Sequence, residues 1–145
     1  MQQTTSIMKR LLLVVFASMI AYIAFAQESY IYTITKDIAN GVEYEGSYTQ
    51  YQIIFNEGRL QSTPLNVNFT STYLYSHQEN GWSIYYYAVW NSFNGRWIVS
   101  KDQWYSVSPD KKTINCPSVY TYSYQPGISV LKQGVQNKSV GTMYE

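Results

Sequence analysis

The chain has 145 residues, a formal net charge of +1 and 16 tyrosines, but only one histidine and one cysteine. A chain of this length fits one small domain, and its near-neutral charge excludes a general attraction to nucleic acid or to anionic membrane. One histidine and one cysteine cannot build a zinc site of the usual kind or an intrachain disulfide, and no phosphate-binding or dinucleotide-binding glycine motif is present, so we expect no metal and no cofactor.

The first 26 residues have the pattern of a secretory signal peptide. The basic pair Lys9-Arg10 precedes an apolar run over 11–26 that ends in "AFA", a small-x-small cleavage site. The run is shorter than the roughly 20 residues that a membrane-spanning helix needs. We therefore expect cleavage after residue 26 and a periplasmic or secreted protein with no stable membrane span, the alternative being an uncleaved anchor. Met1 and Met8 are both possible start residues.

Period-two alternation, and no sustained helical periodicity, follows residue 26. It predicts strands at 29–36, 43–55, 59–62, 70–77, 82–92, 96–100, 103–108 and 113–124. Gly46 is expected to break or bulge the second of these. Asn-Gly pairs at 40–41, 80–81 and 94–95 favour tight hairpins, so sequential strands should pair in an antiparallel meander.

These elements predict a single all-β domain over residues 27–125, with about seven or eight strands. The antiparallel meander would form a small sandwich or a partly closed barrel. Residues 126–145 are polar and interrupted by glycine, and are expected to form a partly ordered C-terminal extension in which "ISVL" can make a last short strand.

The stretch "SIYYYAVW", residues 83–90, places aromatic side chains on both faces of one strand, because successive side chains point to opposite sides. We assign the face with more apolar bulk to the core: Trp82, Ile84, Tyr86, Ala88 and Trp90. The opposite face carries Tyr85 and Tyr87, which are either structural cladding or an exposed aromatic platform for a ligand. Pairing across Asn80-Gly81 brings Tyr73 and Tyr75 close to this strand.

Few residues are candidates for chemistry. Glu43 and Glu45 share one strand face and are the only paired carboxylates, but glutamates two apart usually mark a wet face, so we expect no catalytic residue and no enzyme. His77 is expected to be solvated beside a turn. Cys116 is expected to be a small buried residue, with a reactive thiol or a dimer disulfide as alternatives. Arg96 follows a turn and should face solvent, with carboxylate or ligand binding as the alternative.

Three segments resemble small exported all-β proteins of unknown function from Bacteroidetes: "SYTQYQIIFNEGRL", "AVWNSFNGRWIVSKD" and "YSVSPDKKTIN". In that group a tyrosine-rich strand leads to an F-x-G-R turn, here Phe93 to Arg96, then to S-x-D and SPD-x-K-x-IN motifs. The likeness covers about residues 30–124 and implies an envelope or secreted location, but no activity. Independently of it, Ser108 and Asp110 can hydrogen-bond nearby backbone amides and fix their turn.

Three functions remain open. The first is a non-enzymatic binding or interaction module that contacts a glycan, a small amphipathic molecule or an envelope protein through aromatic side chains. Its candidate ligand-binding residues are Tyr73, Tyr75, Tyr85, Tyr87 and Arg96. The second is a lipocalin-like barrel that carries a small apolar ligand, and the third is a structural or assembly role through an exposed sheet edge. The oligomeric state does not follow from the sequence.

Overall fold

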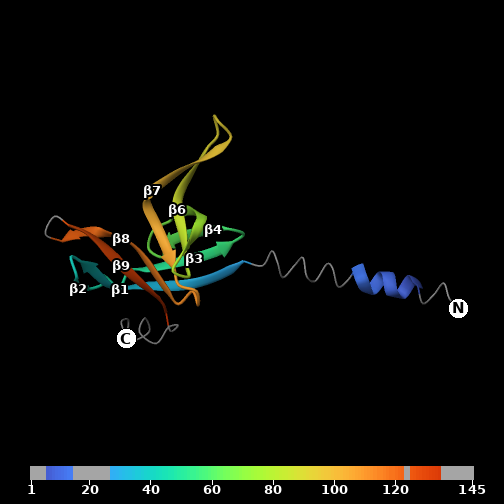
Figure 1. Ribbon diagram of the computed structural model, residues 1–145, viewed down its shortest axis with the longest axis horizontal. Helices are drawn as coiled ribbons and strands as arrows, with labels where there is room; N and C mark the ends of the chain where they lie inside the picture. The colour runs from blue at the N-terminus through green and yellow to red at the C-terminus, as the bar shows by residue number, and fades with distance from the viewer. Residues whose placement is uncertain (1–5, 15–26, 123–124, 135–145) are drawn as a thin grey trace.

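The computed structural model describes residues 6–14, 27–122 and 125–134. Residues 6–14 form a short helix with exposed side chains, and none of the described helical segments is long and apolar enough to cross a membrane. The expected cleavage site after residue 26 lies outside the described residues. Figure 1 shows the strands that make up the rest: β1 (Glu28–Ala39), β2 (Val42–Glu45), β3 (Gln50–Asn56), β4 (Arg59–Pro64), β5 (Ser71–Glu79), β6 (Trp82–Asn91), β7 (Arg96–Val107), β8 (Thr113–Tyr122) and β9 (Gln125–Gln133).

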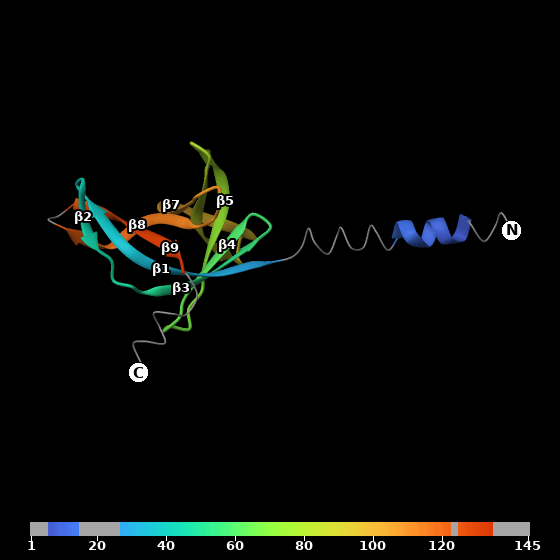
Figure 2. The same ribbon diagram turned by 90° about the horizontal axis from the view of Figure 1, so that it is seen from below.

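The strands form one antiparallel sheet that closes into a barrel, which confirms the predicted all-β fold. Strands β1 and β3–β9 follow one another around it, and β9 pairs back with β1. Strand β2 is extra, and it pairs only with the C-terminal end of β1 (Figure 2). Of the two expected architectures the chain adopts the barrel, in which every strand of the ring pairs with a neighbour on each side over at least part of its length.

Strand β9 shows where the structure differs from the expected boundary at residue 125. It runs over Gln125–Gln133, longer than the short "ISVL" strand that was expected, and it pairs with both β8 and β1. The sequence of β9 alone has only a short apolar run, so its length is set by the two neighbours that supply hydrogen bonds on both sides.

Two of the three Asn-Gly pairs form the predicted tight turns. Asn40 and Gly41 have φ values of 52° and 75°, and Asn80 and Gly81 have 50° and 83°, as a type I′ hairpin turn requires. At the third pair only Gly95 has a positive φ, 62°. The connection there is longer, because the last strand pair before it is Asn91 with Arg96.

Gly46 divides the expected strand 43–55 into β2 and β3, which lie along the same edge of β1. The Gly46 N–H donates to the Thr35 carbonyl over 3.1 Å, and the Tyr48 N–H donates to the Ile34 carbonyl over 3.0 Å. At the same place β1 bulges, because its register with β9 shifts between Ile34 and Lys36. The bulge changes the alternation along β1 and turns Asp37 to the interior, where it is buried.

The barrel interior is filled largely by aliphatic and tyrosine side chains. Fully buried residues from five strands pack there: Tyr32, Ile53, Leu60, Ile114 and Leu131. The Tyr32 hydroxyl donates to the Lys111 carbonyl and ties β1 to the connection between β7 and β8. The buried Tyr32 hydroxyl therefore has a hydrogen-bond partner at one end of the core.

The assignment of the core face of β6 is only partly right: Ile84 and Ala88 on that face are buried, but the main core cluster packs against the opposite face. Tyr85 and Tyr87 are half-buried and pack against the core, with their rings 6.2 Å from Phe55 and 5.6 Å from Tyr73 respectively. Trp90, on the face assigned to the core, is 52% exposed.

The reason is that β6 leaves the barrel before it ends. The expected strands 96–100 and 103–108 are one strand, β7, whose register with β6 shifts between Tyr86, which pairs with Trp104, and Tyr87, which pairs with Ser100. Beyond this irregularity β6 and β7 project from the barrel as a hairpin (Figure 1). The prediction added up the apolar side chains of the whole strand, and it therefore included Trp90, which does not reach the core.

The turn between β7 and β8 has the side-chain hydrogen bonds that the sequence predicts. The Ser108 hydroxyl donates to the Asp110 carboxylate over 2.7 Å and accepts the Thr113 N–H over 3.0 Å, and the carboxylate also accepts the Lys112 N–H. These bonds hold the pKa of Asp110 below its ordinary value, chiefly through the Lys112 amide.

Ser108→Ala should lower the free energy of unfolding by about 1–2 kcal/mol, because it removes a buried hydroxyl and leaves the part-buried Thr113 amide without its partner. Urea unfolding followed by circular dichroism measures the change. Ser92→Ala is the control, since Ser92 is an exposed serine in the turn between β6 and β7. Equal effects of the two substitutions would contradict the prediction.

Candidate functional site

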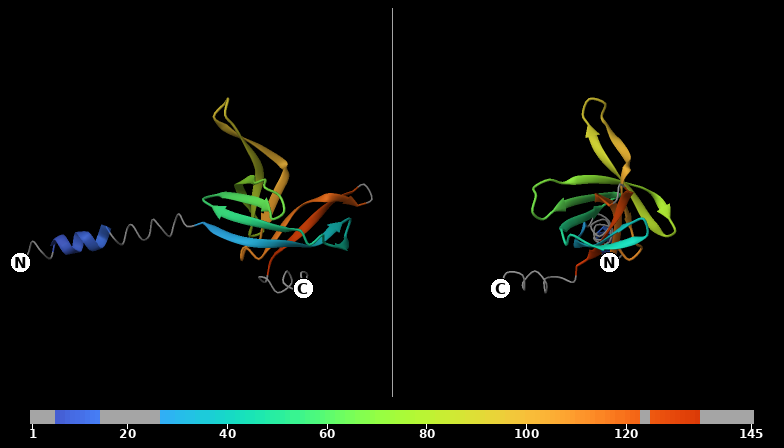
Figure 3. Two further views of the ribbon diagram at one scale, coloured as in Figure 1. Left: turned by 180° about the vertical axis from the view of Figure 1, so that it is seen from behind. Right: turned by 90° about the vertical axis from the view of Figure 1, so that its left-hand side faces the viewer.

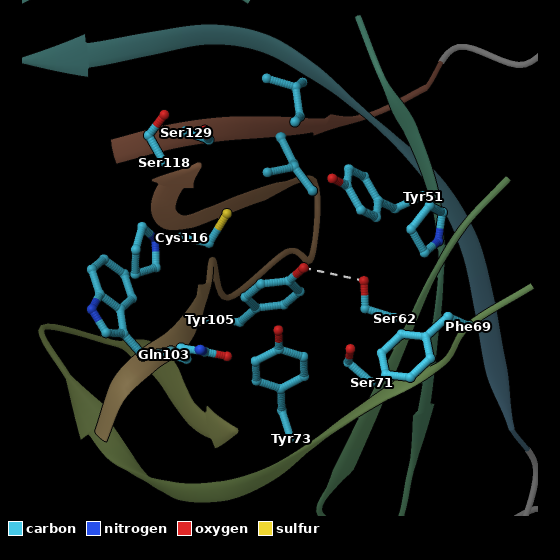
Figure 4. A pocket seen from close by; sticks show the side chains of 15 residues that line it. Tyr51, Ser62, Phe69, Ser71, Tyr73, Gln103, Tyr105, Cys116, Ser118 and Ser129 are labelled. Carbon is cyan, nitrogen blue, oxygen red and sulfur yellow. Dashed lines mark hydrogen bonds between the residues drawn. The ribbon is translucent and has the colours of Figure 1, made fainter. Parts of the chain in front are cut away.

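A pocket of about 370 Å³ lies within the barrel, and Figure 4 shows the side chains that line it. Every barrel strand except β6 contributes to the lining, and Phe69 adds a ring from the connection between β4 and β5. The volume falls within the range of small-molecule sites, roughly 300–1,000 Å³. Side chains from seven strands converge on this pocket, so a ligand there would be surrounded by most of the barrel.

Two tyrosines form one wall of the pocket. The rings of Tyr73 and Tyr105 stack with centroids 4.3 Å apart and an interplanar angle of 17°. The Tyr105 hydroxyl lies 3.1 Å from the Ser62 hydroxyl, the bond drawn as a dashed line in Figure 4. Burial raises the pKa of Tyr73 to about 12 and the pKa of Tyr105 well above its ordinary value. Both phenols are therefore neutral hydrogen-bonding groups at physiological pH.

The rest of the lining combines apolar side chains, among them Ile34, Phe69 and Leu131, with polar but uncharged ones. Hydroxyl and amide groups surround the aromatic wall: Tyr51, Ser62, Ser71, Gln103, Ser118 and Ser129. Among the described residues that line the pocket, none has a carboxylate, ammonium or guanidinium group. A ligand with a net charge would lose its hydration here without gaining an opposite charge in the lining, so the lining favours a neutral one.

Asp37 lies behind this lining and sets the direction of its hydrogen bonds. Its carboxylate accepts the Ser129 hydroxyl over 2.5 Å and the Ser118 hydroxyl over 3.2 Å. A serine hydroxyl has one proton, so both serines spend theirs on the carboxylate and keep only lone pairs for other partners. This part of the pocket therefore accepts hydrogen bonds from donors on a ligand.

Cys116 also lines the pocket, and the prediction that it is buried is confirmed, since it is 8% exposed. Burial, with a smaller contribution from the charge of Asp37, raises the pKa of its thiol to about 12. The thiol is protonated at physiological pH and is a poor nucleophile. It acts in the pocket as a small apolar surface.

The structure separates the five predicted ligand-binding residues. Tyr73 lines the pocket. Tyr87 packs against the Tyr73 ring but is not itself a lining residue. Tyr75 and Tyr85 form an edge-to-face pair 5.7 Å apart, with Tyr75 46% exposed. Arg96 is exposed at the start of β7, on the projecting hairpin.

Sequence reasoning missed most of the pocket. Tyr51, for example, lies in a predicted strand, but nothing local showed that it lines the same pocket as Tyr105 and Ser129. A usable signal was present in β4 and β9. Ser62 lies two residues after the buried Leu60, and Ser129 two residues before the buried Leu131, so each serine shares the inward face of its strand with a leucine. A small polar residue at a core position of a strand is typical of a site that needs a hydrogen bond inside.

The acidic residues that were considered for catalysis lie elsewhere. Glu43 and Glu45 are exposed on β2, and Glu43 forms an ion pair of 3.0 Å with Lys36. In the part of the chain that the structure describes, no group of three or more histidine, cysteine, aspartate or glutamate side chains comes together in a way that could hold a metal ion.

Comparison with known proteins gives no match. No family model matches the sequence, and neither the curated proteins nor the solved structures contain a similar chain. The function is therefore inferred from the barrel and its pocket alone.

Proposed function

We propose that this protein is a non-enzymatic barrel that binds a small neutral molecule in the pocket. The observation that carries the proposal is the stacked pair Tyr73–Tyr105, flanked by hydroxyl groups in a lining without charge. Aromatic walls take the apolar surface of a ligand, and a few placed polar groups orient it. The ligand class is a small amphipathic molecule that has hydrogen-bond donors as well as apolar surface.

The two binding functions considered from the sequence fit this class unequally. The end of a glycan has hydroxyl donors that fit the lone pairs of the Ser129 hydroxyl. A lipocalin-like apolar cargo would use mainly the rings and aliphatic side chains. The hydrogen-bond accepting wall favours the more polar ligand, so we place the glycan end first and the apolar cargo second.

We also propose that the barrel is exported to the periplasm or secreted. The leader-like pattern over residues 1–26 supports this, and so does the position of the first strand. Strand β1 begins at Glu28, so cleavage after residue 26 removes no part of the barrel. Intact-mass measurement on protein recovered from the expressing cells reports whether these residues have been removed.

The binding proposal is tested with Ser71→Phe. Ser71 lines the pocket from β5 and is half-buried, so a ring at this position fills space that a ligand would use. We expect N-phenyl-1-naphthylamine, a neutral fluorescent probe, to bind the wild-type barrel, and Ser71→Phe to weaken its binding at least about tenfold. Native mass spectrometry of freshly purified protein detects any ligand that has been carried along.

Ser76→Phe is the matched control, because it makes the same change on the same strand at an exposed position outside the pocket. Competition with mono- and disaccharides then separates the two ligand classes: displacement by sugars favours the glycan end, and displacement only by apolar molecules favours the cargo. If the probe does not bind, or binds Ser71→Phe as well as the wild type, the pocket is not a ligand site.

A further inference from the structure

The hairpin that projects from the barrel has no strand beside it. We call residues 88–100 the arm; it consists of the distal parts of β6 and β7 and the turn between them. The last residue of β6 that pairs with β5 is Ala88, and β8 reaches β7 only at Ser106 and Val107. The arm therefore stands out from the barrel, as Figures 1 and 3 show.

The arm has apolar side chains on both faces, and Phe93 projects from a tip that is otherwise made of small polar residues and Arg96. Directly paired residues share a face, so Trp90, Trp97 and Val99 lie on one side and Val89 and Ile98 on the other. Five of its large apolar side chains are exposed by about half or more: Val89 49%, Trp90 52%, Phe93 99%, Ile98 55% and Val99 47%. Such a concentration of exposed apolar side chains on a small domain marks an interaction surface.

The turn at the tip satisfies its own backbone. The Asn91 side-chain oxygen accepts the N–H groups of Phe93 and Asn94 over 2.9 and 3.3 Å, and the Asn91 carbonyl accepts the Gly95 N–H over 2.9 Å. Three amides that would lose water on entering an apolar medium are already paired. The turn also holds the Phe93 ring outward, with 99% of its surface exposed.

The one charge on the arm itself, Arg96, is positive, although Asp102 follows Lys101 directly below the arm. Between Glu79 and Asp102 the sequence contains no carboxylate, and its only charged residues there are Arg96 and Lys101. Arg59 adds a third cation, since its guanidinium carbon lies 5.3 Å from the ring centre of Trp97. Phe93 lies at the tip, the pair Trp90 and Trp97 lies behind it, and cations lie nearby. A lipid interface favours this order, because aromatic rings and cations bind at the level of the headgroups.

We propose that the arm inserts its tip into the surface of a lipid bilayer that contains anionic headgroups. A groove on a protein, or the arm of a second copy, would cover one face of this hairpin and leave the other wet. Lipid surrounds an inserted element on all sides, which matches apolar residues on both faces and Phe93 at the tip. The proposal does not depend on the pocket.

The depth of insertion is limited by the backbone. Residues 89–91 and 96–100 of the arm pair with each other but have no strand on their outer sides, because neither β5 nor β8 extends along them. Unpaired N–H and C=O groups are costly in hydrocarbon, so the arm should stay in the interfacial region, roughly 5–10 Å deep. At that level Phe93 reaches the acyl chains while the tryptophans and cations meet the headgroups.

The test uses the exported protein with vesicles of phosphatidylcholine alone or with 30% phosphatidylglycerol. Intact mass establishes whether residues 1–26 are present, and all variants are compared in the same form. Tryptophan fluorescence should shift to shorter wavelength on binding, and brominated lipid should quench it, because Trp90 and Trp97 lie next to the tip. Binding should be tighter with phosphatidylglycerol and should weaken as salt is added.

Phe93→Ser should lower the affinity for the anionic vesicles about tenfold or more, and Val89→Ser severalfold, because each removes apolar surface that the lipid would bury. Val67→Ser is the matched control: Val67 is 51% exposed against 49% for Val89, but it lies in the connection between β4 and β5. It should bind as the wild type does.

The proposal is overturned if neither kind of vesicle changes the tryptophan signal, or if Phe93→Ser binds as tightly as the wild type. It is also overturned if the protein without lipid is a dimer that Phe93→Ser converts to a monomer, since the arm would then be a surface between copies of the chain. Equal binding to both vesicle types would contradict the part of the proposal that requires anionic headgroups, because the cations near the arm would then add nothing to the affinity.

Discussion

Replacing Gly46 with alanine should lower the free energy of unfolding by about 3 kcal/mol or more, which is large for a single methyl group. A Cβ at this position would lie 2.5 Å from the carbonyl oxygen of Ile34 and 2.5 Å from the carbonyl carbon of Thr35. Both are backbone atoms of the bulge in β1. They cannot move away without breaking the bonds that the Gly46 and Tyr48 amides donate to the same two residues.

The substitution should also weaken binding in the pocket. The bulge at Thr35 is what directs Asp37 inward, where the carboxylate holds the hydroxyl groups of Ser118 and Ser129. A shift of β1 at the bulge would break the hydrogen bonds between Asp37 and the two serines before the barrel unfolds. We expect urea unfolding to show the loss of stability and the fluorescent probe to bind more weakly to the folded fraction.

Gly134→Ala is the matched control for this prediction. A Cβ at Gly134 would meet only the Ile31 carbonyl oxygen at 3.6 Å, an ordinary contact, although Gly134 also lies against β1. It should change the stability little. If the two alanine variants unfold at the same urea concentration, the close approach at Gly46 is not what holds β1 in place.

The local parts of the fold follow from the sequence. Strand 82–92 was predicted within one residue of β6, because an Asn-Gly turn and an alternating run of aromatic residues specify both its start and its type. The break at Gly46 was likewise predicted, since glycine in a long alternating run indicates a bulge or a break. These features depend on neighbours within a few residues.

Closure of the barrel does not follow in the same way. It rests on the pairing of β1 with β9, in which Ile38 lies opposite Ile128, and no local pattern encodes a contact over that separation. The core face of β6 was only partly predicted for a related reason, because the irregularity in β7 that turns the hairpin outward depends on tertiary packing. The pocket could not be predicted for the same reasons, because its lining depends on closure of the barrel and on which face of each strand points inward. Tyr73 was a candidate through its pairing with β6, but Tyr105 stacks on it from β7, on the other side of β6, and the sequence did not show that these two rings share the inner face of the sheet.

Raising the pH should unfold the barrel cooperatively, well above the pH at which ordinary tyrosines ionise. Burial raises the pKa of Tyr73 from 10.0 to about 12 and that of the Cys116 thiol from 9.0 to about 12, and it also raises the pKa of Tyr32 and Tyr105. A group with a raised pKa in the folded state contributes stability that is complete below its unfolded pKa and is lost as the pH rises through the folded pKa.

The window follows from these values. Stability should begin to fall near pH 9, where the thiol ionises in unfolded chains, fall faster above pH 10, and be largely lost by about pH 12. One pKa unit corresponds to about 1.4 kcal/mol, so Tyr73 and Cys116 alone remove several kcal/mol, a large share of the roughly 5–15 kcal/mol that stabilises a typical domain. Absorbance at 295 nm and far-ultraviolet circular dichroism, recorded together, measure ionisation and unfolding.

The buried phenols should ionise in the same step in which the circular dichroism is lost. Tyr73→Phe removes one of the groups that drive this step, so its alkaline transition should release fewer protons and be less steep. Tyr75→Phe is the control, because the Tyr75 ring is 46% exposed and its hydroxyl is not part of the buried cluster. If all tyrosines ionise near pH 10 while the strands remain intact, water reaches the stacked rings freely. The pocket wall would then lack the dry environment on which neutral ligand binding depends.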